Sequence, residues 1–404
     1  MSGRTVVVLG GGVGGLTAAN ELRARLGREH RVVLVERRRE HLFAPSLLWL
    51  MVGLRRREQA TRDLRTMLRP GVELVTAEVG AIDVAGGTIA TPEREIPYDD
   101  LVVALGAENA PEALPGYAAG HDVFDLDGAE RFRQALDDFG GGRVLVAVAA
   151  LPYRCPAAPY EAALLVEDAL RRRGLRGRSE VAVYTPEPQP MPVAGPVLGA
   201  AVTALLAGRD IGFHPSRQLG SIDAGARELV FADGARERFD LLALVPPHRS
   251  PRVIRESALA NAAGWVPVDG RSLRTSFERV HAIGDVTAIP LPSGKLLPKA
   301  GVFAHAEALV VARAIAADVT GEPAPSFDGN GYCWVEIGGG RAAFASGDFY
   351  ADPVPAVRLQ APGRQWYAGK VLFERYWMGA GLERALAKAA LRLGARVAGV
   401  PASL

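Results

Sequence analysis

The sequence predicts an α/β protein with two Rossmann-like domains, followed by a C-terminal region with amphipathic helices. Three observations support this fold class. The apolar run Thr5-Val-Val-Val-Leu has the pattern of a buried parallel strand and leads through a glycine-rich turn into a helical pattern. A second strand–turn–helix unit begins at Arg143. From Arg364 onward, aromatic and basic residues recur at helical spacing.

The composition limits the class of protein. The 404 residues suffice for two or three domains, and 49% hydrophobic and 23% charged residues are typical of folded soluble chains. A net charge of +2 gives no general affinity for nucleic acid, and the two cysteines and seven histidines lack zinc-site spacing, so we expect no metal. The chain start leaves no room for a signal peptide, and no apolar run reaches the roughly 20 residues that cross a bilayer. We therefore expect a cytoplasmic protein, with a homo-oligomer left open.

The glycine-rich turn predicts a dinucleotide site. Gly10, Gly12 and Gly15 fit the pattern G-x-G-x-x-G between a strand and a helix. These glycines permit a tight turn, close approach of a pyrophosphate and close helix–strand packing, while the helix N-terminus attracts phosphate. Glu36 ends the next strand, where a carboxylate accepts hydrogen bonds from an adenosine ribose. The motif alone leaves FAD and NAD open.

The remaining elements follow in order. Residues 51–70 are rich in arginine and have a helical pattern, and Pro111, Pro115 and Gly116 mark a linker. After a second α/β unit, the strand pattern that ends at Asp285 returns the chain to the first domain. The predicted units are the first part of the dinucleotide-binding domain (1–115), the second Rossmann-like domain (116–245), the second part of the first domain (246–320) and the C-terminal region (321–404).

The second α/β unit lacks a glycine fingerprint. Between Val144 and Glu161 there is no glycine, and prolines and Cys155 occupy the turn between strand and helix. A pyrophosphate would therefore lack the close backbone approach that glycine permits. We predict that this unit does not bind NAD(P).

Three separated motifs together resemble the two-dinucleotide-fold flavoproteins, which have the glutathione-reductase-type fold. They are the glycine loop with Glu36, the strand Leu-Val-Val-Ala-Leu-Gly106, and the segment Ile-Gly284-Asp285. The resemblance covers about residues 4–320. It implies that the first domain holds FAD and that Asp285 hydrogen-bonds near the ribityl chain.

Four further segments are similar to the sulfide:quinone oxidoreductase group and to the flavoprotein subunit of flavocytochrome c sulfide dehydrogenase. They are Phe43-Ala-Pro45-Ser46-Leu, Cys155-Pro-Ala-Ala-Pro-Tyr-Glu161, Pro298-Lys299-Ala-Gly301-Val and Tyr332-Cys333. The resemblance implies that Cys155 and Cys333 form a redox-active disulfide beside the flavin, with Lys299 near the isoalloxazine. The FAD-site residues expected from the motifs and the resemblance are Gly10, Gly12, Gly15, Glu36, Pro45, Val79, Gly106, Gly284, Asp285, Lys299 and Gly301.

Two departures from that group concern cysteines. Many quinone-reducing members have a third cysteine before the Cys155 position, and none exists here. The additional cysteine of members with covalently attached FAD is also missing, so we expect non-covalent FAD.

The two cysteines and Glu161 are the predicted catalytic residues. A cysteine at a helix N-terminus has a stabilised thiolate, so we expect a lowered pKa for Cys155. Glu161 is the expected proton acceptor. In this hypothesis, hydrosulfide attacks the disulfide, a persulfide remains on one sulfur, and two electrons pass to FAD. The alternatives are inert buried cysteines and a solvated first-turn glutamate.

The C-terminal segment has the features of an interfacial anchor. Leu382, Leu386, Leu393 and Val397 share one helical face, and a basic stripe flanks it (Arg384, Lys388, Arg392 and Arg396). Such helices bind anionic lipid surfaces, although packing on the protein's own core or on a dimer partner is the alternative. The resemblance places Tyr332, Lys370 and Phe373 beside a quinone.

The predicted function is FAD-dependent oxidation of sulfide, or a related small thiol or persulfide, to persulfide or polysulfide sulfur. The electrons would pass to a membrane quinone, with the enzyme peripheral on the inner face of the cell membrane. The alternatives are a sulfide dehydrogenase that reduces a cytochrome, a type II NADH:quinone dehydrogenase and a non-catalytic flavin-binding scaffold.

Overall fold

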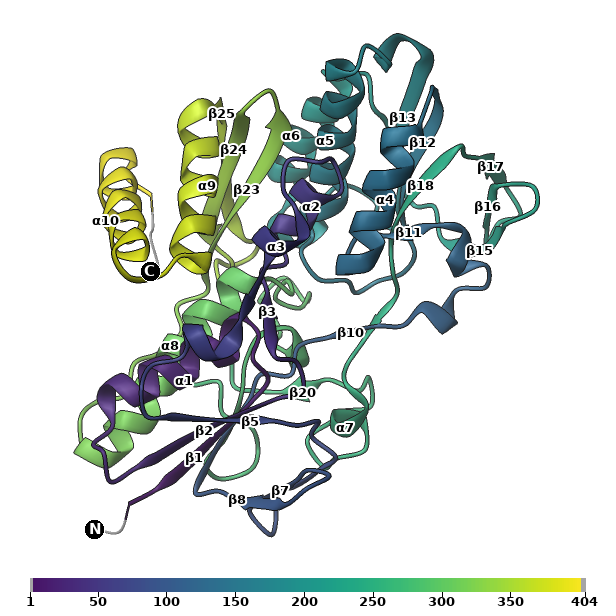
Figure 1. The fold of residues 1–404 in the computed structure, drawn as a ribbon. Helices are drawn as coiled ribbons and strands as arrows, with labels where there is room; N and C mark the ends of the chain where they lie inside the picture. Colours follow the sequence, from purple (N-terminus) through teal and green to yellow (C-terminus); the bar gives the residue numbers. More distant parts are fainter. Residues whose placement is uncertain (1–2, 401–404) are drawn as a thin grey trace.

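The computed structural model describes residues 3–400 and contains two parallel sheets and a C-terminal antiparallel sheet (Figure 1). The first sheet has the order β21-β9-β1-β2-β5, and every neighbouring pair is parallel. Its strands are β1 (Thr5–Leu9), β2 (Arg31–Glu36), β5 (Val72–Thr76), β9 (Asp100–Val103) and β21 (Val280–Ala282). Their near-continuous valine and leucine runs suit strands that are buried on both faces.

Helices α1 (Val13–Arg25) and α8 (Gly301–Thr320) pack against each other beside this sheet (Figure 1). The chain therefore returns to the first unit after residue 280, because β21 adds a strand to the sheet and α8 pairs with α1. A three-stranded antiparallel meander is inserted before β9 and consists of β6 (Ala81–Asp83), β7 (Thr88–Ala90) and β8 (Glu95–Pro97).

The second parallel sheet has the order β11-β18-β12-β13-β14. Its strands are β11 (His121–Asp122), β12 (Gly142–Val148), β13 (Ser179–Tyr184), β14 (Gly212–His214) and β18 (Leu241–Val245). Its helices are α4 (Leu126–Asp138), α5 (Ala158–Arg172) and α6 (Pro196–Ala207). The antiparallel pair β10 (Glu108–Asn109) and β19 (His248–Arg249) marks the two crossings between the sheets. The predicted α/β fold class is confirmed.

The C-terminal sheet contains β23 (Asn330–Gly338), β24 (Arg341–Asp348) and β25 (Ala356–Gly363), all antiparallel. Helix α9 (Arg364–Met378) packs on this sheet, and α10 (Gly381–Ala398) packs on α9 at the periphery (Figure 1). Strand β23 also packs against α5 of the second unit, so the second unit and the C-terminal sheet share an interface. No helix in residues 3–400 is long and apolar enough to cross a membrane.

The Arg-rich segment 51–70 is not the helix that its pattern predicts. It forms only α3 (Arg57–Ala60), β4 (Thr61–Asp63) and a 3-10 turn (Leu64–Met67), after the buried helix α2 (Ser46–Leu50). Tertiary contacts decide the conformation here: β4 pairs with β3 (Glu40–Leu42), and Arg62 Nη1 donates to the carbonyls of Met378 and Gly379, each at 2.6 Å.

The remaining elements are short. The strands are β15 (Leu219–Asp223), β16 (Glu228–Phe231), β17 (Arg236–Arg238), β20 (Val266–Pro267) and β22 (Thr287–Ala288), with one helical turn α7 (Arg252–Arg255). The other 3-10 turns are Pro111–Ala113, Tyr117–Ala119, Arg176–Arg178, Pro192–Ala194 and Gly284–Val286.

Candidate active site

The glycine loop between β1 and α1 has the geometry of a phosphate cradle. Gly10 has a φ of +98°, and a Cβ on Gly15 would lie 1.8 Å from the Gly10 carbonyl oxygen, so both positions require glycine. A Cβ on Gly12, in contrast, would meet no protein atom within 4 Å. Gly12 is the N-cap of α1 and provides no side-chain cap, so the first N–H groups of the helix face this open space.

Glu36 fixes the end of β2 to this loop. Its Oε2 accepts a hydrogen bond from the Gly11 backbone N–H at 2.6 Å, and its Oε1 accepts one from the Arg38 N–H at 2.9 Å. The carboxylate therefore lies beside the glycine loop, where the adenosine end of a dinucleotide would reach it. Its contact with the ribose stays a prediction.

Asp285, a half-buried acid shortly after β21, also fits a flavin site. Asp285 follows Gly284, whose φ is +72°, and Asp285 Oδ1 is buried without a hydrogen-bond partner among the described residues. Burial raises the pKa of Asp285. A buried polar atom without a partner is costly, and a ribityl hydroxyl would satisfy it. The residues present therefore fit a flavin dinucleotide.

Lys299 connects the acid to the cysteine turn. Its Nζ donates to the carbonyls of Asp285 at 2.6 Å and Thr287 at 3.1 Å, and it lies 3.5 Å above the Trp265 ring centroid. Burial lowers the pKa of Lys299 to about 8. The Lys299 carbonyl accepts a hydrogen bond from the Cys155 N–H at 2.6 Å. One residue thus contacts both the predicted flavin acid and the predicted sulfur site.

The other predicted FAD-site residues lie at the ends of the first unit's elements. Pro45 is the N-cap of α2, and Val79 is buried shortly after β5. Gly106 follows β9 with a φ of +68° and open space at its Cβ position. Gly301 begins α8, but a Cβ there would only make ordinary contact with Val13 at 3.6 Å, so sterics do not require glycine.

Cys155 and Cys333 come from separate elements but lie close enough for the charge of Cys155 to affect Cys333. Cys155 occupies the turn before α5 with a φ of +55°, a rare conformation for a non-glycine residue. Cys333 lies on β23, where its thiol donates to the Trp334 carbonyl at 3.3 Å. A charge on Cys155 raises the pKa of Cys333 further, beyond the increase that burial causes. Both cysteines are free thiols with partial exposure.

The predicted decrease in the pKa of Cys155 is wrong. Burial raises the pKa of this thiol to about 12, and the nearby Glu161 adds to the increase while Lys370 opposes it. The N-cap of α5 is Ala157, so Cys155 lies two residues before the N-cap and is not at the helix N-terminus itself. Desolvation therefore outweighs the helix dipole, and forming a thiolate here needs a proton acceptor.

Glu161 lies beside the Cys155 thiol and is not the solvated acid of the alternative interpretation. Its role as the proton acceptor stays a prediction. It lies in the first turn of α5, is 4% exposed, and forms an ion pair with Lys370 of α9. Lys370 also donates to Glu336 Oε2 at 3.1 Å. Burial raises the pKa of Glu161 to about 7, while Lys370 lowers it and Glu336 raises it.

Sequence reasoning missed Glu336 and its partner Trp49, whose Nε1 donates to Glu336 Oε2 at 2.6 Å. The available signal was a single acid inside the apolar strand Tyr-Cys-Trp-Val-Glu-Ile, because a charge in a buried strand requires a partner.

The turn that lacks glycine is filled by side chains. Glu187 follows β13, the position in the second unit that corresponds to Glu36 in the first. Its Oε2 accepts hydrogen bonds from Tyr153 Oη at 2.8 Å and from Tyr160 Oη, and Tyr160 is fully buried. The acid that would bind the ribose of NAD is thus already paired, which supports the prediction that this unit does not bind NAD(P).

Two of the three predicted quinone residues, Tyr332 and Phe373, lie in an aromatic cluster on the C-terminal side. The Phe373 ring of α9 lies 5.2 Å from Trp334, 6.0 Å from Phe43 and 6.5 Å from Tyr332, measured between ring centroids. Lys370, one turn earlier, points instead into the ion cluster and lies 4.6 Å from the Trp49 ring centroid. Quinone contact with these residues stays a prediction.

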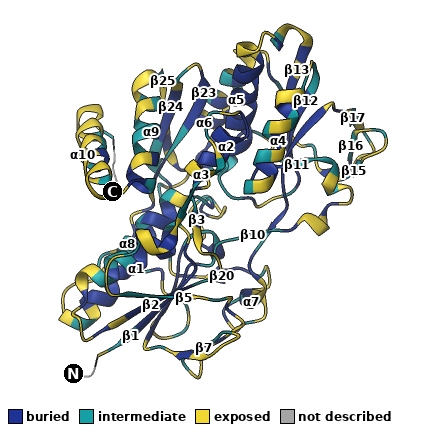
Figure 2. Cartoon of the chain, viewed as in Figure 1, coloured by how far each residue is buried: buried dark blue, intermediate teal, exposed yellow. Residues whose placement is uncertain are grey.

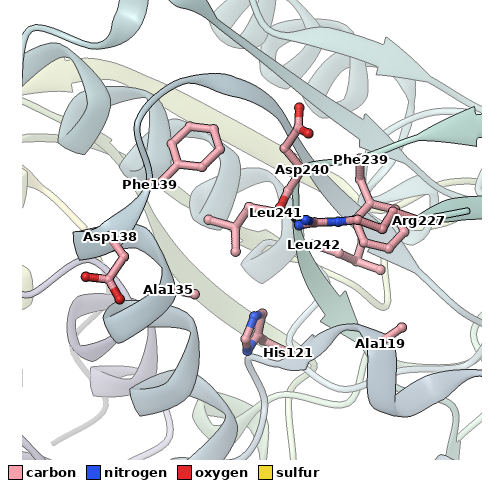
Figure 3. Close-up of a pocket in the computed structure, with 10 residues that line it drawn as sticks. All are labelled: Ala119, His121, Ala135, Asp138, Phe139, Arg227, Phe239, Asp240, Leu241 and Leu242. Atoms are coloured by element: carbon pink, nitrogen blue, oxygen red, sulfur yellow. Dashed lines mark hydrogen bonds between the residues drawn. The ribbon is translucent and has the colours of Figure 1, made fainter. Parts of the chain in front are cut away.

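A cavity of about 270 Å³ lies elsewhere, in the second unit (Figure 3). His121 and Leu241, which line it, begin β11 and β18, and the lining residue Asp138 ends α4. Ligands of open α/β sheets bind at the carboxyl ends of the strands, and this cavity lies at the amino ends. It is therefore separate from the thiols and the glycine loop.

Comparisons with known proteins agree with this geometry. A family model described as pyridine nucleotide-disulphide oxidoreductase matches residues 4–308. The mitochondrial sulfide:quinone oxidoreductase of Mus musculus is 26% identical over 372 residues, which cover 86% of this chain and 79% of the mouse protein. The sulfide-quinone reductase of Aquifex aeolicus is 26% identical over 398 residues, which cover 92% of this chain and 90% of that protein.

The solved structure of the sulfide:quinone oxidoreductase from Aquifex aeolicus matches with a TM-score of 0.82 at 24% identity, covering 92% of this chain and 90% of that one. A type II NADH:quinone oxidoreductase of Haemophilus influenzae is 24% identical over 380 residues, or 81% of this chain and 83% of that protein. The family model spans more than half of the sequence. The chain therefore belongs to the pyridine nucleotide-disulphide oxidoreductase family.

Proposed function

We propose that this chain is an FAD-dependent enzyme that oxidises sulfide, or a small thiol or persulfide, and reduces a quinone. The observation that carries the proposal is the convergence of the chain's only two cysteines beside the buried Glu161 and the Lys299 bridge to Asp285. The similarity to sulfide:quinone oxidoreductases from mouse and Aquifex aeolicus supports the choice of sulfide and quinone.

The flavin would be held without a covalent bond. The glycine loop and the α1 N-terminus would bind the pyrophosphate, Glu36 the adenosine ribose, and Asp285 the ribityl chain. Both cysteines are committed to the sulfur site, so neither remains to attach the flavin. When bound, FAD would take two electrons from the sulfur site and release them to the quinone.

The sulfur steps balance with the groups present. In the oxidised enzyme Cys155 and Cys333 would share a disulfide. Hydrosulfide attacks one sulfur, which breaks that bond, forms a persulfide bond on the attacked cysteine and releases the other as a thiolate. Joining the persulfide and the thiolate into a polysulfur bridge forms one S–S bond and releases one proton and two electrons. Glu161 would accept the proton because it lies beside both sulfurs.

We propose that α10 is the helix that attaches the enzyme to the membrane surface. Four apolar residues of this helix are 74%, 61%, 65% and 82% exposed, namely Leu382, Leu386, Leu393 and Val397. Figure 2 colours most of α10 as exposed. Packing on the protein's own core, one of the two alternative interpretations, does not account for such exposure, and packing on a dimer partner stays open. With the basic stripe alongside, this face suits an anionic membrane surface on the inner side of the cell membrane.

The double variant Leu386→Glu/Leu393→Glu is expected to weaken binding to anionic vesicles at least about tenfold, since burying each leucine contributes about 1.5 kcal/mol. Vesicle co-sedimentation measures this. The matched control is Val197→Glu/Val354→Glu, which changes two exposed valines elsewhere (76% and 52% exposed) and is expected to bind like the wild type. Equal binding by the α10 variant would remove α10 as the anchor.

Turnover with a soluble quinone tests the proposed function. Purified enzyme is supplied with sulfide, a small thiol or NADH, and quinone absorbance is followed. Sulfide-dependent quinone reduction is expected, with NADH inactive because Glu187 and the tyrosines fill the second unit's turn. Reduction by NADH but not by sulfide would instead assign the chain to the type II NADH dehydrogenases. Reduction of cytochrome but not of quinone by sulfide would change the acceptor.

A further inference from the structure

The cluster formed by Glu161, Lys370 and Glu336 contains one cation and two carboxyl groups. The three residues come from α5, α9 and β23, and they are 4%, 6% and 1% exposed. Lys370 Nζ contacts Oε1 of Glu161 and, at 3.1 Å, Oε2 of Glu336. The three side chains are in direct contact and almost inaccessible to solvent, so the cluster behaves as a buried unit.

The charges of this unit do not balance when both carboxyls are ionised. A buried ion pair tolerates charges that compensate each other, whereas an uncompensated buried charge costs several kcal/mol. With Lys370 protonated, one carboxylate balances the cluster and the second carboxyl is neutral only when it carries a proton. The cluster is therefore built to hold one exchangeable proton.

The contacts distinguish the two carboxyls. Glu336 Oε2 accepts hydrogen bonds from Lys370 and from Trp49 Nε1, and both partners are donors only. Both hydrogen bonds hold the Glu336 side chain on the side of Lys370 and Trp49. Glu161 contacts Lys370. The charge of Glu161 also raises the pKa of both Cys155 and Cys333, so Glu161 lies near the two thiols. We place the exchangeable proton on Glu161, because it is the carboxyl of the cluster beside the two thiols and burial raises its pKa to about 7.

We infer that Glu336 is a positioning residue for the proposed sulfide oxidation: it holds the Lys370 ammonium from the far side, so that Glu161 keeps an exchangeable proton beside the two sulfurs. The inference rests on the proposed function in one respect: the proposed sulfide oxidation supplies the proton that Glu161 accepts. In the step concerned, the S–H bond of a thiol or persulfide breaks, an O–H bond forms on Glu161, and Lys370 stays protonated. No electrons change place in this transfer.

The titratable and charged groups that face Glu161 are Cys155 from the preceding turn, Cys333 and Glu336 from β23, and Lys370 from α9. On the α2 side the cluster meets Trp49, which does not titrate. Burial raises the pKa of Glu161 to about 7, and the Glu336 charge contributes to that increase. Removing the Glu336 charge therefore lowers the pKa of Glu161, because Lys370 then pairs with Glu161 alone.

Glu336→Gln tests the inference, since glutamine keeps the shape and an oxygen for Trp49 but not the charge. The matched control is Glu374→Gln. It removes a different buried carboxylate, which lies on α9 and pairs with Arg55 and Ser46 outside the cluster. The direct readout is the infrared carbonyl band of a protonated carboxyl, assigned to Glu161 by its loss in Glu161→Gln. Flavin content and the unfolding temperature establish that each variant is folded.

In the wild type, the Glu161 band is expected to titrate near pH 7. In Glu336→Gln its midpoint is expected about one unit or more lower, and in Glu374→Gln it stays in place. The acid limb of the pH profile for sulfide-driven flavin reduction is expected to move to lower pH by the same amount in Glu336→Gln. An unmoved band in a folded Glu336→Gln protein overturns the inference. A band that shifts as expected in an enzyme that sulfide does not reduce leaves the inference standing and rejects the proposed function.

Discussion

Replacing Cys155 or Cys333 with alanine is expected to slow sulfide-driven flavin reduction by at least about 1000-fold while the flavin stays bound. Each variant lacks one of the two sulfurs that make the redox bond, so hydrosulfide has no disulfide to attack. The glycine loop, Glu36 and Asp285, which would hold the flavin, keep their structures because neither thiol hydrogen-bonds to them.

Rapid-mixing absorbance of the flavin band measures this effect, and the flavin-to-protein ratio serves as the internal control. Cys155→Ala retains the backbone hydrogen bond to the Lys299 carbonyl, so a loss of rate reports the sulfur and not the turn. Wild-type rates in both variants would contradict the disulfide mechanism and favour the interpretation of inert buried cysteines.

Alanine at Gly12 and alanine at Gly15 are expected to fail in different ways. A Cβ on Gly12 meets no protein atom within 4 Å, so Gly12→Ala should leave the unfolding temperature of the flavin-free protein unchanged. The same methyl group intrudes on the space assigned to the pyrophosphate, so flavin affinity should fall at least about tenfold. In Gly15→Ala the Cβ would lie 1.8 Å from the Gly10 carbonyl oxygen, so the loop itself cannot form.

Thermal unfolding without flavin and flavin fluorescence titration separate the two effects. Gly15→Ala should lower the unfolding temperature and abolish flavin binding together. Wild-type flavin affinity in Gly12→Ala would show that the open space in front of α1 is not the dinucleotide site.

The parts of the structure that sequence predicts best depend on neighbouring residues. The strand–turn–helix at Gly10 to Gly15 is predictable because the turn conformation and the helix–strand contact need glycine at set positions. The exposed apolar face of α10 is predictable for the same reason, since one helix carries the whole pattern. In both cases the determining contacts lie within a single stretch of chain.

The parts that sequence predicts poorly depend on distant partners. The pKa of Cys155 is set by burial and by Glu161 and Lys370, and local helix position predicts the wrong sign. Glu336 pairs with Lys370, which is 34 positions away in the sequence, and with Trp49, which is 287 positions away. Segment 51–70 likewise follows its contacts with α9 and the residues after it, rather than its own helical pattern.

The most direct test of the central claim is an anaerobic absorbance titration of the purified holoenzyme. Sodium sulfide and NADH are added to separate samples while the visible flavin band is followed. The account predicts that sulfide bleaches the band with about one equivalent per flavin, through two-electron transfer from the Cys155–Cys333 site, and that NADH leaves it unchanged. Bleaching by NADH with no response to sulfide would contradict the account.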